Sequence, residues 1–332
     1  MIKMNQFLAF EVTKTDNVFA RGIVRKEPQT LPNKHVAIKV DYSDINYKDA
    51  LASSKDGGVI REYPKIPGID LAGEIIESRS EHWHVGQKVL VTGYGLGVSV
   101  NGGFSQYQQV PEEWLVALPD QLTTKEAMIF GTAGFTAALA VTKLLKDTPK
   151  DGRVVVTGAS GGVGSVAIAL LHRLGYTNIT AVSRKKADVA WLKDLGATAI
   201  VEPEEILPEQ VKPLNKQRIA AVIDSVGGDL LAGLLSQINY GGSVFLCGNA
   251  GGLQLNTTVL PFILRGIKMV GIDSVNVEMT ERKATWQFLA EHQPLIEQLH
   301  YQEVALIDLD EPVDALLAGT HQGRTIVQME VR

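Results

Sequence analysis

Three glycines have the spacing of a phosphate-binding loop. Gly158, Gly161 and Gly164 lie in VVVTGASGGVGSVAIALLHRLG, between an apolar run typical of a buried strand and a longer run typical of a helix. A dinucleotide pyrophosphate needs a tight turn, close approach of the backbone and the free N–H groups of a helix N-terminus. A glycine triplet alone is weak evidence, but the strand before it and the helix after it supply the required context. The stretch predicts a dinucleotide-binding site.

The next predicted strand, NITAVS, ends in a hydroxyl followed by cations. The residues concerned are Ser183, Arg184 and Lys185. A site that prefers NAD usually carries an acidic residue here for the ribose hydroxyls. A hydroxyl and two cations can instead bind the 2′-phosphate of NADPH. Cations destabilise a helix N-terminus, so their presence here indicates a role other than helix stability. The sequence therefore favours NADPH.

Metal-ligating residues are scarce. Cys247 is the one cysteine of the chain, which excludes an internal disulfide and a cysteine-built zinc site. His82 and His84 are two residues apart beside a turn-and-strand pattern, and no third ligand follows nearby. We expect no bound metal, and we expect Cys247 to pack as a small residue at a strand end rather than to act as a nucleophile.

A polar stretch, DINYKDAL, follows the strand-like run HVAIKVDYS near the N-terminus. Taken alone, its simplest interpretation is local. Ser43 or Asp44 would cap a helix. The apolar residues of that helix, Ile45, Ala50 and Leu51, would pack inward.

The elements that must position these residues form two regions. Residues 1–123 contain short strand-like runs punctuated by Gly and Pro, which predicts an irregular β-rich domain. Within 124–275 a long helix is followed by alternating strands and helices, which predicts a doubly wound parallel sheet. Residues 276–332 add a helix and a final strand. We expect the strand in IKMVGIDSV to lie at the end of the parallel sheet.

Composition limits the class of protein. The chain has 332 residues, of which 45% are hydrophobic and 21% charged, as in a two-domain globular protein. A net charge of −5 argues against a general nucleic-acid binder. No apolar run is long enough to span a bilayer and no leader is evident. The single cysteine weakly favours a reducing compartment. These features predict a cytoplasmic protein that binds neither nucleic acid nor membrane.

Nearly the whole chain resembles the medium-chain dehydrogenase/reductase family. The matching blocks, in order, are NYKDALA, IPGIDLAGEI, GTAGFTA, VVTGASGGVGS, LLHRLGY, NYGGSVFLCGNAGG, TTVLPFILRG, GIDSV and GRT. The resemblance is to the zinc-free quinone oxidoreductase branch and its YhdH/YhfP group, which includes acryloyl-CoA reductases. It implies a GroES-like β-rich catalytic domain to which residues 276–332 return, a Rossmann domain and a homodimer.

The activity that this resemblance implies is hydride transfer from NADPH to an activated α,β-unsaturated acceptor such as an enoyl-CoA thioester. An NADPH:quinone oxidoreductase is the alternative within enzymes. An NADPH-binding sensor without turnover is the alternative of another class, because fold alone does not settle function.

The resemblance also gives roles to residues near the opening stretch. Zinc-dependent relatives carry ligands where this chain has Asn46 and Ile69. The resemblance implies that Asn46 and Tyr47 face nicotinamide and substrate, with Tyr47 as hydrogen-bond donor to the developing oxyanion and Asn46 as a positioning group. Asp70 either orients the site or bonds backbone amides.

The implied cofactor contacts lie in the matched blocks. They are Tyr47, Ser160, Gly161, Gly162, Val163, Ser183, Arg184, Lys185, Asn249, Ile263, Ser274 and Arg324. For Ile263, core packing is the open alternative. Some relatives carry an arginine after the strand in TAIVEPEE, which this chain lacks, so one contact to a 2′-phosphate is absent from the pattern.

Overall fold

The chain divides into two compact units. The computed structural model describes residues 6–16 and 18–330. Unit 1 contains the chain up to Thr132, then Val275–Ile296 and the segment from His300 onward. Unit 2 contains Ala133–Ser274 and Glu297–Leu299. The C-terminal segment belongs to the same unit as the N-terminal part of the chain, and the first boundary between the units falls inside a helix.

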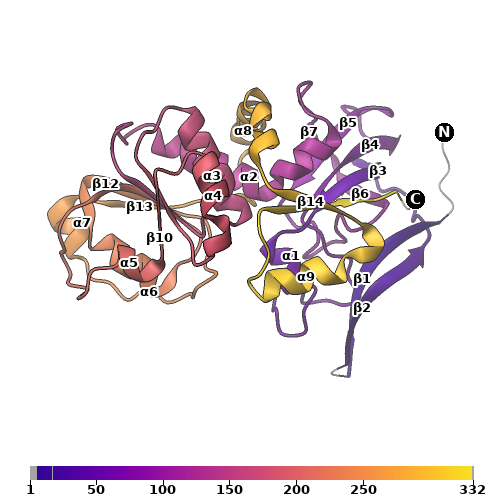
Figure 1. Cartoon of the computed structure of the whole chain (residues 1–332). Helices are drawn as coiled ribbons and strands as arrows, with labels where there is room; N and C mark the ends of the chain where they lie inside the picture. The colour runs from indigo at the N-terminus through magenta and orange to yellow at the C-terminus, as the bar shows by residue number, and fades with distance from the viewer. Residues whose placement is uncertain (1–5, 17, 331–332) are drawn as a thin grey trace. The chain divides into compact units, whose positions relative to one another are not determined.

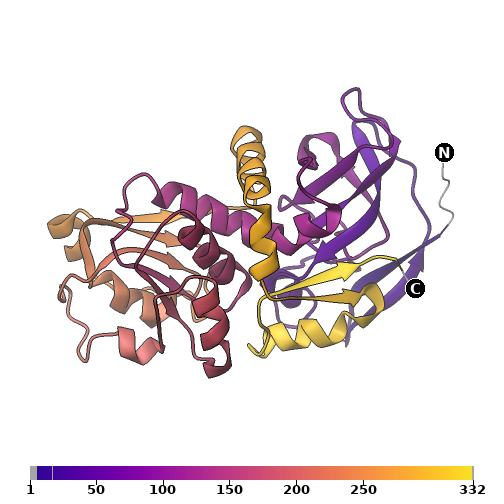
Figure 2. The same cartoon turned by 45° about the horizontal axis from the view of Figure 1, so that its top comes forward.

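Unit 1 is built on a mixed sheet with the strand order β14-β15-β3-β4-β5-β7, and β6 pairs with β3. These strands are β3 (His35–Asp44), β4 (Asp70–Ser78), β5 (Lys88–Thr92), β6 (Tyr107–Pro111), β7 (Val116–Ala117), β14 (Tyr301–Ala305) and β15 (Arg324–Gln328). A separate antiparallel hairpin is formed by β1 (Phe7–Thr15) and β2 (Val18–Lys26) (Figure 1). The predicted β-rich first region is confirmed. The β14–β15 pair is parallel and brings the C-terminal segment into this sheet (Figure 2).

Short helices complete unit 1. They are α1 (Tyr47–Ala52), α8 (Met279–Glu291) and α9 (Asp310–Leu317), with the 3₁₀ turns η1 (Glu112–Trp114), η3 (Gln293–Gln298, whose last residues belong to unit 2) and η4 (Leu306–Asp308). Helices α1 and α9 pack side by side. The core lies under the sheet, where buried apolar side chains of β3, β4 and β5 meet those of β1 and the loops. This packing stabilises the strand ends that carry the polar residues described below.

Unit 2 is a parallel sheet in the order β10-β9-β8-β11-β12-β13. Its strands are β8 (Val154–Thr157), β9 (Ile179–Val182), β10 (Ala199–Val201), β11 (Ile219–Asp224), β12 (Ile238–Leu246) and β13 (Lys268–Gly271). The connecting helices are η2 (Lys186–Asp188), α3 (Gly162–Arg173), α4 (Val189–Asp194), α5 (Pro203–Ile206), α6 (Gly228–Leu235) and α7 (Leu260–Arg265) (Figure 1). The chain order reverses between β8 and β11, which is the topological switch point of a dinucleotide-binding sheet. The predicted doubly wound sheet and the end position of β13 are both confirmed.

Helix α2 (Thr124–Leu144) begins in unit 1 and ends in unit 2. It is interrupted at Gly131, whose φ of 51° and ψ of −160° are not helical. By length and composition this helix could cross a membrane, but 83% of its most apolar window is buried inside the protein. Its apolar side chains therefore serve as core.

Candidate active site

A cluster of buried polar side chains lies where strands β3 and β4 meet. Because these strands are antiparallel neighbours, the end of β3 and the start of β4 share one edge of the sheet. Asn46 follows β3, and its Nδ2 atom donates to Asp44 Oδ1 at 2.6 Å and to Asp70 Oδ2 at 2.7 Å. Asp44 and Asp70 are fully buried and Asn46 is 9% exposed. One amide group thus holds two carboxyl groups together.

Arg324 brings a cation to this pair from the first position of β15. Because that strand pairs with β3, the side chain of Arg324 lies beside the end of β3. Arg324 Nη2 lies 3.0 Å from Asp44 Oδ2, and the arginine side chain is 3% exposed. Nε donates to the Ile129 carbonyl at 3.0 Å, and Nη1 lies 3.4 Å from Asn46 Oδ1. The guanidinium is therefore engaged within unit 1.

The interruption of α2 at Gly131 fits against this ion pair. A Cβ atom at Gly131 would lie 1.8 Å from Asp44 Oδ2 and 2.5 Å from Arg324 Nη2, so no other residue fits. The break turns the next residue, Thr132, toward β4. Its N–H donates to Asp70 Oδ2 at 2.7 Å and its hydroxyl to Asp70 Oδ1 at 2.5 Å. We call Asp44, Asn46, Asp49, Asp70, Thr132 and Arg324 the carboxylate cluster.

Asp49 is the third buried carboxyl group of the cluster. It accepts hydrogen bonds from the backbone N–H groups of Asn46 at 2.9 Å, Gly68 at 3.1 Å and Ile69 at 2.9 Å. Burial, and then the negative charge of Asp70, raise the pKa of Asp49 to about 7, although these hydrogen bonds act in the opposite direction. Asp49 joins α1 to the loop before β4, and so fixes the start of the helix.

The pKa of Asp44 is raised well above its usual range. Burial is the largest cause and the charge of Asp70 the second, while Arg324 lowers the pKa. Two carboxyl groups this close do not ionise together without a large energetic cost. The cluster therefore retains a proton at pH values where exposed aspartates have lost theirs.

The local capping interpretation of DINYKDAL is wrong in its details. Ser43 and Asp44 belong to β3, and Asn46 is the N-cap residue of α1. The Asp44 carboxyl group pairs with Arg324 and accepts a hydrogen bond from Asn46, and does not cap the helix. Of the apolar residues expected to pack inward, Ile45 and Ala50 are buried and Leu51 is half-buried. The Asp70 carboxyl group accepts hydrogen bonds from the Asn46 side-chain amide and from one backbone N–H, that of Thr132.

Tyr47 is the first residue of α1 and is 43% exposed. The described part of the chain provides no hydrogen bond to its hydroxyl. Ile69, which we expected to stand where zinc-dependent relatives carry a ligand, is 4% exposed. Among residues 6–16 and 18–330, no group of three or more His, Cys, Asp or Glu side chains is arranged to hold a metal ion.

The glycine-rich loop of unit 2 has the local geometry that a pyrophosphate requires. Gly158 follows β8 with a φ of +59°, and Gly161 is the N-cap residue of α3. A Cβ atom at Gly164 would lie 2.4 Å from the Gly158 carbonyl oxygen, so the turn and the helix pack as closely as only glycine permits. Ser160 is buried, whereas Gly161, Gly162 and Val163 are half-buried. The loop therefore fits a dinucleotide on the helix N-terminus.

The cationic segment follows β9, beside this loop. Ser183 Oγ accepts from the Lys185 N–H at 3.1 Å, which folds the segment into a tight turn. Arg184 is exposed and Lys185 half-buried. Burial lowers the pKa of Lys185, the nearby Asp188 opposes this, and Arg184 lowers it further. An anion placed between the two cations would relieve their repulsion.

The remaining predicted contacts of unit 2 lie in different places. Asn249 follows β12 and is exposed, and Ser274 follows β13 and is half-buried. Because all strands of the sheet are parallel, these residues lie at the same sheet edge as the glycine-rich loop. Ile263 instead lies on α7, where it is 70% exposed. Core packing of Ile263 is therefore wrong.

A polar network between β8 and β11 was not expected. Thr157 Oγ1 donates to Asp224 Oδ1 at 2.6 Å, and Ser225 Oγ donates to the Thr157 carbonyl at 3.0 Å. Asp224 Oδ2 accepts from the Gly227 N–H at 2.8 Å, and burial raises the pKa of Asp224. The network ties the two strands together at the switch point. The sequence signal was an aspartate that ends an apolar strand, AAVID.

Cys247 lies at the end of β12 near Asp224. Burial, and then the charge of Asp224, raise the pKa of its thiol to about 12. The thiol therefore stays protonated at neutral pH, which agrees with the packing role expected for it and not with a nucleophile.

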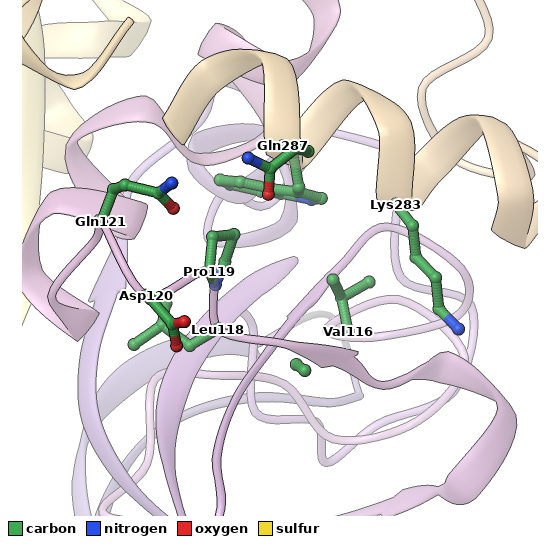
Figure 3. A pocket seen from close by; sticks show the side chains of 9 residues that line it. Val116, Leu118, Pro119, Asp120, Gln121, Lys283 and Gln287 are labelled. Carbon is green, nitrogen blue, oxygen red and sulfur yellow. The ribbon is translucent and has the colours of Figure 1, made fainter. Parts of the chain in front are cut away.

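A pocket in unit 1 lies between β7 with its following loop and one face of α8 (Figure 3). Lys283, Trp286 and Gln287 of α8 face Val116–Gln121 across it. The pocket shares no residue with the carboxylate cluster.

Comparison with known proteins matches both units. Residues 32–120 match the family model "Alcohol dehydrogenase GroES-like domain" and residues 162–291 match "Zinc-binding dehydrogenase". A protein named "Probable acrylyl-CoA reductase AcuI", from Escherichia coli (strain K12), is 46% identical over 90% of this chain and 92% of its own length. A protein named "Putative quinone oxidoreductase YhfP", from Bacillus subtilis (strain 168), is 42% identical over 97% of this chain and 99% of its own.

Solved structures give the same result. The yhdH oxidoreductase from Salmonella enterica, in complex with NADP, has a TM-score of 0.92 and 44% identity over 97% of this chain and 100% of its own. The Bacillus subtilis yhfP structure, with NAD bound, has a TM-score of 0.93 and 41% identity over 98% of this chain and 100% of its own. The chain belongs to the medium-chain dehydrogenase/reductase family, in the group that contains YhdH, YhfP and AcuI.

Proposed function

We propose that this protein is an NADPH-dependent reductase that transfers hydride to an activated α,β-unsaturated acceptor, an enoyl thioester such as acryloyl-CoA. The observation that carries the cofactor assignment is the glycine-rich loop after β8 beside the cationic turn after β9. The acceptor class is supported by the AcuI relative, 46% identical over nearly the whole chain. A quinone is the second candidate acceptor because YhfP, named a quinone oxidoreductase, is almost as similar.

The residues of unit 2 would bind the cofactor. Ser160–Val163 would hold the pyrophosphate with backbone N–H groups, and Ser183–Lys185 the 2′-phosphate. Asn249, Ser274 and Ile263 are proposed contacts on the nicotinamide side. When bound, NADPH supplies the hydride.

The residues of unit 1 would stabilise the negative charge that develops on the substrate. Hydride addition at the β-carbon of an enoyl thioester places negative charge on the thioester oxygen, which then requires positioned hydrogen-bond donors. Tyr47 is proposed as such a donor, because its side chain is 43% exposed and the described residues of unit 1 form no hydrogen bond with its hydroxyl. The side-chain amide of Asn46 donates hydrogen bonds to Asp44 and Asp70. Because both amide protons are engaged in these bonds, the proposed role of Asn46 is to position the start of α1. For Arg324, whose guanidinium is engaged in the cluster, a contact with the cofactor remains a prediction.

No metal is part of this proposal. The buried amide of Asn46 and the aliphatic Ile69 stand where zinc-dependent relatives carry ligands. Activity should therefore persist after chelator treatment, and stoichiometric zinc in active protein would contradict this expectation.

A homodimer and a cytoplasmic location are also proposed. Strand β13 ends the parallel sheet, and its edge is a surface that proteins normally cover. Exposed apolar residues gather on α7 and β13: Val259, Leu260, Ile263, Leu264 and Met269. Pairing of two β13 edges about a two-fold axis would cover both features.

The test is NADPH consumption with acryloyl-CoA, crotonyl-CoA and benzoquinone, using wild type and Tyr47→Phe. Loss of the Tyr47 hydroxyl should reduce thioester turnover by roughly 10²–10³-fold and quinone reduction far less, because a quinone accepts electrons without an oxyanion donor. Equal small losses would remove Tyr47 from the mechanism. Wild-type activity with benzoquinone alone would move the assignment to a quinone reductase, and tight NADPH binding without any turnover would indicate a sensor.

A further inference from the structure

Arg282 on α8 is a fully buried arginine whose guanidinium donates hydrogen bonds to oxygen atoms of unit 1. Nη1 donates to the Thr92 carbonyl at 2.7 Å and to the Thr92 hydroxyl at 2.9 Å, and Nη2 donates to the Val275 carbonyl at 2.9 Å. A buried charge is costly unless its hydrogen bonds are satisfied. Arg282 therefore joins the end of β5 to Val275, the residue at which the chain returns to unit 1.

Tyr94, in the loop after β5, holds the same carbonyl group. Its N–H donates to the Val275 carbonyl at 3.1 Å, and the guanidinium of Arg282 lies 4.5 Å from the centre of its ring. The ring of Trp114 stacks on that of Tyr94 at 5.2 Å with an angle of 5° between their planes. Tyr94 has a φ of +52°, which is uncommon for a residue with a side chain and persists where the surroundings fix it. We call Thr92, Tyr94, Val275 and Arg282 the Arg282 anchor.

Both ends of the Arg282 anchor lie next to residues of the proposed site. Thr92 is the register partner of Asp70 in the β4–β5 pair, so the end of β5 lies at the same sheet edge as the carboxylate cluster. Val275 directly follows Ser274, the proposed contact on the nicotinamide side. The anchor therefore fixes the residue next to Ser274 relative to the strand beside Asp70.

We propose that Arg282 is a positioning residue for hydride transfer, because its bond to the Val275 carbonyl holds the neighbouring Ser274 in place for the nicotinamide. The inference rests on the proposed NADPH-dependent reduction. In this role Arg282 acts through Val275 and Ser274, and not on the hydride acceptor. A displacement of about 1 Å between reacting groups can cost roughly 10²-fold in rate. Loss of the anchor should therefore slow the reduction of an enoyl thioester and of a quinone alike, unlike loss of the Tyr47 hydroxyl.

The experiment uses Arg282→Lys, which keeps the positive charge but loses the forked guanidinium, and Thr92→Val, which removes one hydroxyl partner of Arg282 and keeps the shape. Calorimetry measures the affinity of each variant for NADPH and for 2′,5′-ADP, which carries the 2′-phosphate but no nicotinamide. Turnover is measured with acryloyl-CoA and with benzoquinone. Arg21→Lys is the matched control, because Arg21 also lies in unit 1 and donates to a carbonyl, that of Ser53, at 3.2 Å. Thermal unfolding reports whether each variant is folded.

In Arg282→Lys we expect NADPH to bind about tenfold more weakly, while the affinity for 2′,5′-ADP stays that of the wild type. The turnover number should fall roughly 10²-fold with acryloyl-CoA and with benzoquinone, and the KM for either acceptor should change little. Thr92→Val should show the same pattern with smaller losses, because the Thr92 and Val275 carbonyls still accept from Arg282. Arg21→Lys should match the wild type in both affinities and both rates.

Wild-type NADPH affinity and rates in a folded Arg282→Lys variant would overturn the positioning role and leave the proposed function intact. Equal weakening of NADPH and 2′,5′-ADP would assign Arg282 a general structural role, and a rate loss confined to one acceptor would also overturn the proposal. If Arg282→Lys does not fold, Thr92→Val decides by the same criteria. A wild type that reduces benzoquinone but not acryloyl-CoA would overturn the enoyl thioester as substrate, while the NADPH affinities and the benzoquinone rates would still decide the role of Arg282.

Discussion

Arg324 and Asp44 form an ion pair in which Nη2 and Oδ2 are 3.0 Å apart, with side-chain exposures of 3% and 0%. The two residues come from opposite ends of the chain and meet because β15 pairs with β3. Two further buried carboxyl groups, those of Asp49 and Asp70, lie in the same cluster. Removing the positive charge of Arg324 would therefore leave several buried carboxyl groups without a counter-charge. The first two predictions follow from this relationship.

Removing the cation should destabilise unit 1 strongly. Arg324→Met leaves Asp44 and Asp70 buried without a counter-charge, a change that costs about 3–5 kcal/mol in the free energy of unfolding. Adding Asp44→Asn to Arg324→Met should restore part of this loss, and urea denaturation of the single and double variants measures the coupling. The control is Lys268→Met, because the Lys268–Asp147 pair is about half exposed and should contribute less than about 1 kcal/mol. A loss below about 1 kcal/mol for Arg324→Met would contradict the prediction.

Gly131→Ala should be much more costly than alanine at another glycine with positive φ. Both Gly131 and Gly86 have positive φ. A residue with a side chain is less stable in this conformation by about 1–2 kcal/mol. At Gly86 a Cβ atom meets nothing within 4 Å, whereas at Gly131 it lies 1.8 Å from Asp44 Oδ2. We expect Gly131→Ala to lose about 2 kcal/mol or more beyond Gly86→Ala because of this overlap. If urea denaturation gave equal losses of unfolding free energy for Gly131→Ala and Gly86→Ala, the structure would have relieved the overlap with Asp44 at no cost, and the prediction would be wrong.

Asp49 should make stability fall as pH rises from about 4 to about 7. Its pKa is raised to about 7 in the folded protein by burial and by the charge of Asp70, against about 4 in an unfolded chain. Between these values the folded state binds more protons than the unfolded state, so the free energy of unfolding decreases with pH. Relative to Asp49→Asn, the wild type should therefore lose stability across this window, by an amount on the order of a few kcal/mol.

Chemical denaturation at pH 4.5, 6 and 7.5 provides the measurement for this prediction, with the exposed Asp56→Asn as the control that keeps the wild-type slope. A difference between wild type and Asp49→Asn that stays constant with pH would contradict it.

NADPH should bind more tightly than NADH. The 2′-phosphate would gain charge-assisted hydrogen bonds from Arg184 and Lys185, each worth about 1.5–3 kcal/mol. Arg184→Ala and Lys185→Ala should therefore weaken NADPH binding at least about tenfold and leave NADH binding nearly unchanged. Lys186→Ala removes the same charge from a side chain that is 90% exposed, so it serves as the control. Equal affinities of the wild type for the two cofactors would refute the assignment.

The apolar surface on α7 and β13 should be covered by a second copy of the chain. Leu264, 55% exposed, lies on this surface, and Leu264→Asp should convert a dimer into a monomer when the mass is measured by light scattering at micromolar concentration. Val85→Asp is the control, because Val85 is 58% exposed but lies in unit 1. A wild-type monomer at these concentrations would exclude the dimer.

Features that are local in the chain could be predicted from the residues alone. The glycine-rich loop, the cationic turn and the strand–helix alternation of unit 2 each depend on residues within one strand–turn–helix segment, whose spacing carries the structural information. The end position of β13 also followed from this alternation, because a doubly wound sheet grows outward from its first strand.

The carboxylate cluster could not be predicted in this way, because it forms only when distant segments pack together. Asp44, Asp70, Thr132 and Arg324 come from β3, β4, α2 and β15, and no spacing in the sequence relates them. DINYKDAL alone suggested a capped helix, because an aspartate before a helix usually caps it. The pairing of β15 with β3 gave Asp44 a buried arginine as partner, and the break at Gly131 turned Thr132 toward Asp70. Burial of several carboxyl groups around one cation is a property of three-dimensional packing, and the pKa shifts that follow from it exist only in the folded protein.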